Sequence, residues 1–167
     1  MKRKLIALLS MAVLVITLTM TLSGLHTTAG ETKDTWIPDK YLPYINQVCA
    51  EYHICPELVM AIIEQESSGQ ADAVNGDYKG LMQISEHWHK DRMERLGVTD
   101  LYDPYSNILV GVDYLAELAC ECDDLYTVLM IYSGTADVIK RGETGDWSDY
   151  AKEVVQRSME LERLHGK

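Results

Sequence analysis

The chain has 167 residues, which is enough for one domain of ordinary size together with a targeting segment. Hydrophobic residues make up 47% and charged residues 25%, proportions that exclude a disordered, collagen-like or coiled-coil protein. Fifteen basic residues against 26 acidic ones give a formal net charge of -11. Because nucleic-acid binding depends on a cationic surface, we expect no nucleic-acid partner.

The first segment has the pattern of an export signal. Basic residues at positions 2–4 precede an apolar run over residues 5–22. Small residues up to Ala29 provide a cleavage site, so we predict a signal peptide over residues 1–29. The run is also long enough to cross a bilayer, which makes an uncleaved membrane anchor the alternative. Either reading places the folded part, residues 30–167, outside the cytoplasm, and removing three basic residues changes its net charge from -11 to -14.

An even number of cysteines lies in the exported part, and in an oxidising compartment this favours disulfides. A bond between neighbouring late cysteines would close a cramped loop, so we predict that the two early cysteines pair with the two late ones, in a structural role. Their spacing fits a zinc site badly, so we expect no metal. The four residues are Cys49, Cys55, Cys120 and Cys122.

The first half of the exported part is predicted to be helical. Apolar spacings of three and four residues indicate a helix that is capped by Asp39 and runs through Cys49. Pro56 suits the first turn of a second helix, which is apolar nearly all round and ends near Ser67. Turn residues then predict a loop that lasts to Gly80.

The second half is predicted to be helical as well. A short helix over residues 87–96 is followed by a longer one, which Asp103 caps and proline begins. Gly111 on its buried face is expected to let another helix approach closely. Two more helices cover residues 125–132 and 148–164. Alternation typical of strands is absent, so the predicted fold class is all-α, in a single globular domain.

Two carboxylates stand at the end of the apolar helix that begins at Pro56. Glu64 and Glu66 are two positions apart, so on a helix they point roughly 200° away from each other. We expect one to be exposed and the other to turn inward. Glu66 precedes a glycine-containing loop, where burial in a cleft wall would raise its pKa and let it donate a proton. On spacing alone, the alternative is a solvated carboxylate at a helix end.

Three sequence blocks stand in order along the chain. They are Glu66-Ser67, then Gly80-Leu81-Met82-Gln83-Ile84, then Asp103-Pro104 with Asn107-Ile108, Gly111 and Tyr114-Leu115. Together they resemble the lytic transglycosylase domain of the soluble-lytic-transglycosylase type, a relative of goose-type lysozyme, over about residues 41–154. The resemblance implies a lysozyme-like helical fold with a groove for peptidoglycan glycan strands.

The resemblance also implies roles for residues of the first two blocks. Glu66 matches the single catalytic acid and base of the family. Ser67 follows it and is expected to help hold the site or the sugar. Gln83 corresponds to a groove residue that hydrogen-bonds the glycan, and Met82 lies beside it.

Further site residues are implied near the C-terminus. Tyr132 falls at the Ala-Tyr-Asn motif of the family, where the tyrosine hydroxyl orients the catalytic carboxyl. Tyr150 resembles a late tyrosine that lines the same groove. Ser133 stands where the family usually has asparagine, so a rotatable hydroxyl replaces an amide. This departure is expected to weaken sugar binding, shift specificity or lower activity.

The implied activity is cleavage of the bond between N-acetylmuramic acid and N-acetylglucosamine, which leaves a 1,6-anhydromuramoyl end and needs no cofactor. The alternatives are a hydrolytic muramidase of the same fold and a non-catalytic protein that binds or assembles the cell wall. We expect a monomer at the cell wall, secreted or anchored, whose substrate is peptidoglycan. Local opening of the wall for a secretion, conjugation or phage apparatus is one setting in which such a protein acts.

Overall fold

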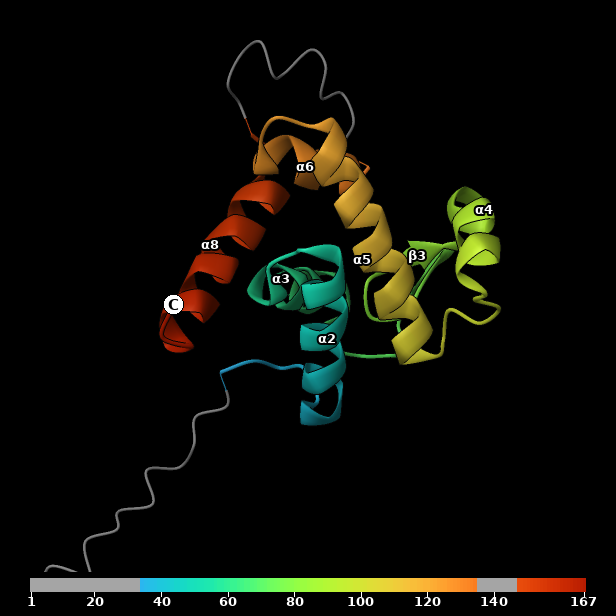
Figure 1. The fold of residues 1–167 in the computed structure, drawn as a ribbon, viewed down its shortest axis with the longest axis horizontal. Coiled ribbons are helices and arrows are strands. Elements are labelled where there is room, and N and C mark those ends of the chain that lie inside the picture. Colours follow the sequence, from blue (N-terminus) through green and yellow to red (C-terminus); the bar gives the residue numbers. More distant parts are fainter. Residues whose placement is uncertain (1–33, 135–146) are drawn as a thin grey trace, which may run out of the picture. The chain divides into compact units, whose positions relative to one another are not determined.

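The computed structural model of the chain describes residues 34–134 and 147–167 (Figure 1). The predicted signal peptide or anchor, with its apolar run over residues 5–22, lies outside the described residues. Across the two described ranges, no helix combines the length and the apolar character that a membrane span requires.

The N-terminal half is built around the buried helix α3. A short 3-10 turn, η1 (Asp39–Tyr41), leads into α2 (Leu42–Tyr52), which is followed by α3 (Pro56–Ser67). Asp39 does not cap α2 as predicted, because the helix begins only after the turn that contains it. Every residue of α3 from Glu57 to Ile63 is buried, which confirms the prediction of an apolar helix inside the core.

A small antiparallel sheet occupies part of the segment that we predicted as a loop. It consists of β1 (Val74–Asn75), β2 (Tyr78–Lys79) and β3 (Ile84–Ser85), in the order β1-β2-β3. Val74 pairs with Lys79, and Tyr78 pairs with Ser85. Two residues per strand are too few to show alternation, so the sequence pattern did not reveal these strands.

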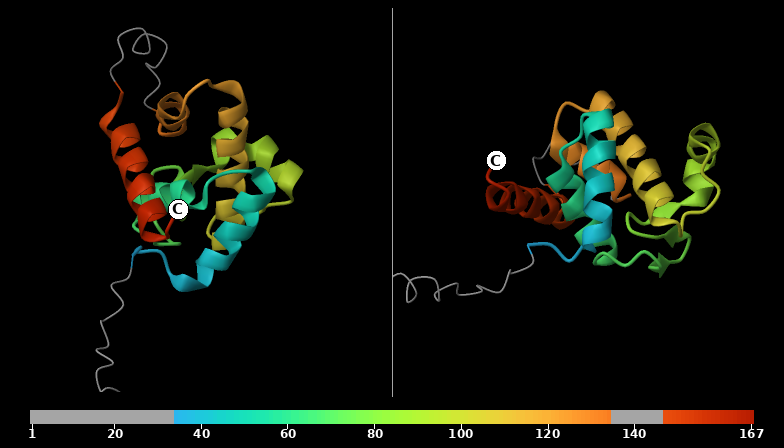
Figure 2. Two further views of the ribbon diagram at one scale, coloured as in Figure 1. Left: turned by 60° about the vertical axis from the view of Figure 1, so that its left-hand side comes forward. Right: turned by 60° about the horizontal axis from the view of Figure 1, so that its bottom comes forward.

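The remaining described elements are helices, close to the predicted bounds. They are α4 (Glu86–Leu96), α5 (Pro104–Glu121), α6 (Leu125–Tyr132) and α8 (Asp149–Leu164). The side chains of Asp103, Asp124 and Ser148 each accept a backbone hydrogen bond at the start of α5, α6 and α8. The described fold is therefore mostly helical, with α8 packed along α3 and α5 packed against α2 and α6 (Figure 1, Figure 2).

Gly111 permits a close approach, but by a side chain and not by a helix. The sulfur of Met82 lies where a Cβ at position 111 would stand. Met82 is fully buried, so the loop after β2 is held against the middle of α5 by this contact.

The predicted pairing of early with late cysteines is wrong, because all four cysteines are free thiols. Cys49 is buried in α2, whereas Cys120 is exposed at the end of α5. The Cys55 thiol donates instead to the carboxylate of Glu57 at 3.2 Å. Within the described ranges, no group of three or more His, Cys, Asp or Glu side chains is placed to hold a metal ion.

Candidate active site

Glu66 lies in the last turn of α3, where its side chain meets the beginning of α8. The hydroxyl of Tyr150 donates a hydrogen bond of 2.6 Å to Oε1 of Glu66. Burial raises the pKa of the Glu66 carboxyl above its usual value, although the Tyr150 hydrogen bond acts in the opposite direction. The carboxyl is therefore placed to keep a proton at higher pH than a solvated glutamate does.

Tyr132 belongs to the same cluster, but its hydroxyl does not make the contact that we predicted. It donates to the backbone oxygen of Met82 at 2.9 Å, while its ring stacks on Tyr114 with centroids 5.5 Å apart. Burial and the nearby Glu66 carboxylate both raise the pKa of Tyr132. The tyrosine that orients Glu66 in this structure is thus Tyr150, because the Met82 carbonyl engages the hydroxyl of Tyr132.

The loop that carries Met82 is fixed by Asn107 of α5. The Asn107 side-chain oxygen accepts from the Met82 backbone N–H at 2.8 Å, and its nitrogen donates to the carbonyls of Lys79 and Leu101. Asn107 is fully buried. We included this residue in the third sequence block without assigning it a role, although a polar side chain on the buried face of a helix was the signal.

The loop also depends on Gly80, which comes directly before Leu81. Its φ of +75° lies in the left-handed region that favours glycine. A Cβ at this position would lie 2.6 Å from the carbonyl oxygen of Leu101 and would overlap the Asn107 amide. Glycine is therefore needed here for both conformation and space.

Ser67 and Met82 support the site from inside the protein. The Ser67 hydroxyl is buried and donates to the carbonyls of Ile63 and Leu81, at 3.1 and 2.8 Å. With the Met82 side chain also buried, neither side chain lines a groove in this structure.

Gln83 and Ser133 are half-buried, and both make hydrogen bonds within the protein. The Gln83 amide nitrogen donates to the carbonyls of Ala73 and Gly80, at 3.2 and 3.0 Å. Its backbone has a φ of +48°, which is uncommon for a residue other than glycine. The Ser133 hydroxyl, just after α6, donates to the Met130 carbonyl at 3.2 Å.

A hollow of about 510 Å³ opens beside Tyr132 and is rich in aromatic side chains. Trp88 has 73% of its surface exposed, and the ring of His89 lies 4.5 Å from that of Tyr114. Aromatic faces with a few polar groups suit a ligand that has apolar faces and polar edges. No sequence pattern predicted this hollow, whose other lining residues are Tyr78, Arg92, Glu117, Ile131 and Gly134.

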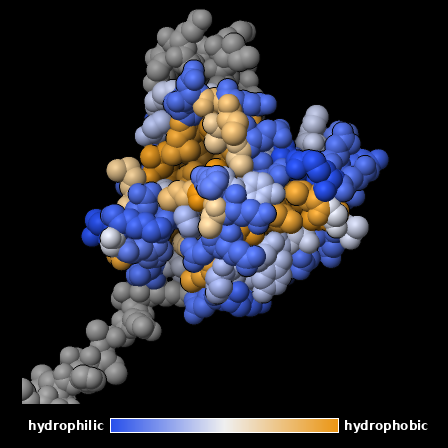
Figure 3. All heavy atoms as spheres, viewed as in Figure 1, coloured by the Kyte–Doolittle hydropathy of each residue, from blue (hydrophilic) through white to orange (hydrophobic). Residues whose placement is uncertain are grey.

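Hydrophobic surface also lies between the helices that carry the two site tyrosines. On the face shown in Figure 3, orange surface gathers between α6 and α8, the helices that end at Tyr132 and begin beside Tyr150. This apolar surface therefore lies between the two helices that carry the site tyrosines.

Residues 43–154 match the family described as the transglycosylase SLT domain. The chain belongs to this family. A relative from Enterobacteria phage PRD1, named transglycosylase, is 36% identical over 91 residues, which are 54% of this chain and 33% of that protein. A membrane-bound lytic murein transglycosylase C from Serratia proteamaculans is 32% identical over 123 residues, or 64% and 34% of the two chains. The protein of the same name from Shigella sonnei is 33% identical over 123 residues.

The chain spans about a third of the length of these relatives. The match confirms the resemblance that the three sequence blocks indicated, and the described helices confirm the fold class, with the small sheet as an addition. Because the match ends at residue 154, it covers Tyr150 but stops before the later turns of α8.

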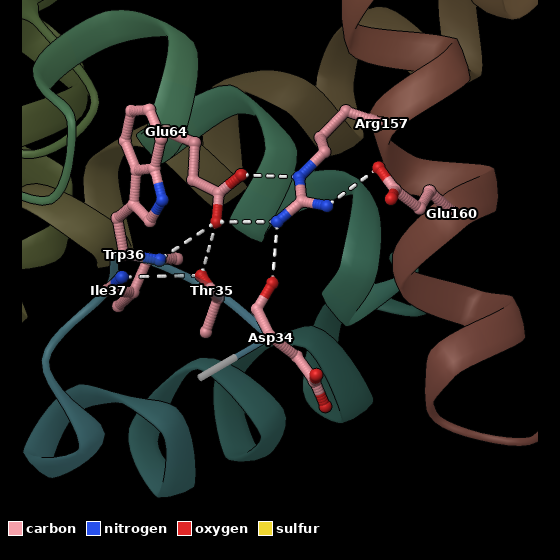
Figure 4. Close-up of polar contacts among 7 residues, drawn as sticks. All are labelled: Asp34, Thr35, Trp36, Ile37, Glu64, Arg157 and Glu160. Carbon is pink, nitrogen blue, oxygen red and sulfur yellow. Dashed lines mark hydrogen bonds and ion pairs between the residues drawn. The ribbon is translucent and has the colours of Figure 1, made fainter. Parts of the chain in front are cut away.

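The other carboxylate near the end of α3 in this SLT domain, that of Glu64, binds an arginine (Figure 4). Glu64 accepts hydrogen bonds from Arg157 of α8 and from Thr35, with shortest distances of 2.6 and 2.5 Å. Burial alone would raise the pKa of Glu64, but these hydrogen bonds outweigh it and lower the pKa. We expected one of the two carboxylates to be exposed, yet the Glu64 side chain is only 10% exposed. Its partner is 93 positions away and gave no local signal.

Proposed function

We propose that this SLT domain is a lytic transglycosylase that cleaves peptidoglycan between N-acetylmuramic acid and N-acetylglucosamine. The observation that carries the proposal is the environment of Glu66, whose pKa is raised by burial and whose carboxyl receives the Tyr150 hydroxyl. A general acid must keep its proton near working pH, and such an environment supplies this property. The printed names of the relatives, which are transglycosylases, support the same reaction.

The proposed mechanism uses one carboxyl in two steps. Protonated Glu66 donates to the glycosidic oxygen as the bond to C1 breaks, and the 2-acetamido group of the muramic acid stabilises the developing positive charge. The Glu66 carboxylate then takes the proton of the 6-hydroxyl, whose oxygen bonds to C1 and closes a 1,6-anhydro ring. The hydroxyl is tethered to the reacting sugar, which gives it an entropic advantage over free water.

Tyr150 has a distinct part in this scheme. Its hydrogen bond favours the ionised form of Glu66, which exists between the two proton transfers. The tyrosine therefore stabilises the intermediate state of the acid, while burial stabilises the protonated starting state. The two effects act in opposite directions, and together they keep the carboxyl able both to give and to take a proton.

The aromatic hollow beside Tyr132 is the proposed binding surface for the glycan. Trp88 offers an exposed face on which a sugar ring can stack, and Tyr114 and Tyr132 form the neighbouring wall. Gln83 and Ser133 stand at the edge of the loop and of α6, where we propose that they contact the sugar. Replacing the family asparagine by Ser133 removes one amide from this edge and is proposed to weaken binding.

A hydrolytic muramidase is the second candidate, and it would benefit from a further carboxylate to activate water. The nearby candidate on α3 is Glu64, but its carboxylate is held by Arg157, Thr35 and the Trp36 N–H. This engagement favours ring closure over hydrolysis. A purely wall-binding role is disfavoured by the burial of Glu66, since a binding module gains nothing from a carboxyl of raised pKa.

The proposed setting is the cell wall, where the protein acts outside the cytoplasm as a monomer, either secreted or anchored. The phage origin of one relative supports a role in opening the wall locally for a phage, and the membrane-bound relatives support action near a membrane.

The test is mass spectrometry of the sugars released from purified peptidoglycan by the full chain in mild detergent. We expect products one water lighter than reducing muropeptides, and their loss in Glu66→Gln. Glu51→Gln, which changes an exposed glutamate of α2, is the matched control and should remain active. Reducing ends in place of anhydro ends would identify a muramidase, and an absence of products with wild-type protein that still binds the wall would overturn the proposal.

A further inference from the structure

Helix α8 contacts α3 through directional bonds at several places. The exposed Gln65 amide donates to Glu153 at 3.1 Å, and two further bonds reach the carboxylates near the end of α3. Tyr150 donates to Glu66, and Arg157 donates to Glu64. The two α8 residues are seven positions apart, which is close to two helical turns, so they lie on the same side of the helix about 10 Å apart along its axis. Between them, the buried contacts of α8 come from Ala151 and Val154.

The Arg157 contact is the more extensive of the two (Figure 4). Its Nε donates to Oε2 of Glu64 at 2.6 Å, and its Nη2 donates to Oε1 of Glu64 at 3.2 Å and to the Asp34 carbonyl at 2.6 Å. Its Nη1 donates to Glu160 at 2.8 Å. A planar guanidinium that binds one carboxylate with two nitrogens fixes direction as well as distance.

Glu64 also receives the segment that precedes η1, which we call the N-terminal strap (residues 34–37). The hydroxyl of Thr35 and the N–H of Trp36 donate to Oε1 of Glu64 at 2.5 and 3.1 Å, and Ile37 is fully buried. One carboxylate thus joins α3, α8 and the strap. Arg157 therefore attaches α8 both to α3, through Glu64, and to the strap, through the Asp34 carbonyl.

Apolar packing is not directional, so Ala151 and Val154 do not by themselves determine how far α8 is shifted along α3. Of the other polar contacts, the Gln65–Glu153 bond is exposed, and Glu57 of α3 binds His165 and Lys167 beyond the end of α8, far along the helix from Tyr150. The Tyr150 hydroxyl, by contrast, must reach Glu66 within about 3 Å. From this geometry we infer that Arg157 is a positioning residue, which fixes α8 along α3 through Glu64 so that the Tyr150 hydroxyl meets Glu66. The inference rests on the proposed function, in which Glu66 is the catalytic residue.

The effect of Arg157 on Glu66 is expected to be indirect. Among the described residues, the titratable groups that interact with Glu66 are Tyr150 of α8 and Tyr132 of α6, and Arg157 does not belong to this set. Without Arg157, α8 can move and the Tyr150 hydrogen bond is lost for part of the time. Since that bond favours the ionised carboxylate, its loss should raise the pKa of Glu66 further, as removal of the Tyr150 hydroxyl should.

The experiment is a carbon-13 NMR titration of the Glu66 side-chain carboxyl in the full chain, with the resonance assigned from Glu66→Gln. We expect Tyr150→Phe to raise the pKa by about one unit, the effect of losing one hydrogen bond to a charged group. Arg157→Met should raise it in the same direction, and the double variant should not exceed Tyr150→Phe alone. Arg163→Met, which removes an exposed charge from the same helix, should leave the titration unchanged.

Activity provides the second readout. We expect Arg157→Met to lower kcat about tenfold with little change in KM, and to move the pH optimum upward. If Arg157→Met does not fold, Arg157→Lys replaces it, because lysine keeps the charge but cannot bind the carboxylate with a planar fork. Arg157→Lys should then give a smaller shift in the same direction.

Two results would overturn the inference. One is a Glu66 titration in Arg157→Met, or in its lysine replacement, that matches wild type. The other is a shift that adds fully to that of Tyr150→Phe, which would mean that the two side chains act independently. The NMR titration does not require turnover. If the wild-type protein were inactive, the proposed function would be contradicted, but the titration would still show whether Arg157 positions Tyr150.

Discussion

The side chain of Asn107 and the backbone of Met82 are joined by a 2.8 Å hydrogen bond, and this contact links α5 to the loop that carries the tyrosine-binding carbonyl. Asn107 is fully buried and also binds the carbonyls of Lys79 and Leu101. One amide therefore satisfies three backbone groups that would otherwise be buried without partners. The placement of Tyr132 depends on this amide through Met82.

Replacing Asn107 by leucine should therefore destabilise the protein strongly. The change keeps the volume but leaves the Met82 N–H and two carbonyls unpaired, and we expect a loss of about 3 kcal/mol in the free energy of unfolding. Urea denaturation measures the loss, with the exposed Asn46→Leu in α2 as the control. A loss no larger than that of the control would show that the loop is held by other contacts.

Gly80→Ala should be more harmful than the same change at another glycine of positive φ. Gly76 has a φ of +61° and nothing within 4 Å of a built Cβ, so alanine there should cost about 1 kcal/mol for backbone conformation. At Gly80 the new methyl group also meets Asn107 and the Leu101 carbonyl, and we expect about 3 kcal/mol. Equal shifts of the urea midpoint in the two variants would contradict the steric argument.

The stability of the protein should depend on Glu57 in acid. Its 2% exposed side chain contacts His165 and Lys167, each at 2.8 Å. Burial would raise the pKa of Glu57, but the hydrogen bonds from Lys167, His165 and Cys55 outweigh it and lower the pKa from 4.5 to about 2. A depressed folded-state pKa contributes stability that is present above pH 4.5 and is lost as the pH falls toward 2.

Glu57→Gln tests this dependence. Solvent at Lys167 screens the ion pair, so we expect the variant to lose about 2 kcal/mol in its free energy of unfolding at pH 6. The difference in this free energy between variant and wild type should narrow steadily between pH 4.5 and 2. Unfolding by urea at a series of pH values measures the gap. If the gap stayed constant across that range, the ionised carboxylate would not be the source of the stability.

Trp88→Ala should weaken glycan binding without affecting the fold. The ring lines the aromatic hollow and is 73% exposed, so its removal takes away a stacking surface but little core packing. We expect a loss of about 1 kcal/mol or more in binding of an N-acetylglucosamine oligosaccharide, measured by calorimetry. The control is Trp36→Ala, a change of a 69% exposed tryptophan that does not line this hollow. Unchanged affinity in Trp88→Ala would remove the hollow from the binding surface.

The helices of this fold were predictable because their signals are local. Pro56, Asp103 and Ser148 stand at helix starts, and the structure places α3, α5 and α8 at the expected positions. The strands were not predictable, since two-residue strands are held by pairing with their neighbours and not by a pattern of their own.

The candidate site was predictable only in part. Glu66 and its place at the end of a buried helix followed from the sequence, but the exchange of partners between Tyr132 and Tyr150 did not. The bond from Tyr132 to Met82 joins residues that are 50 positions apart in the sequence, and the bond from Tyr150 to Glu66 joins residues that are 84 positions apart. Local sequence patterns do not indicate which hydroxyl reaches which acceptor over such separations. The same reason applies to Arg157, which became visible only when α8 was placed along α3.

The packing of Met82 against Gly111 also makes the site sensitive to oxidants. Conversion of a thioether to a sulfoxide adds a polar oxygen, and the Met82 side chain is fully buried against Gly111, where such an oxygen would be costly. Met159, which is 64% exposed, can take up the same oxygen without disturbing the core. Peroxide should thus modify the surface methionine first with little effect, and activity should disappear only when oxidation reaches Met82 and displaces the carbonyl that holds Tyr132.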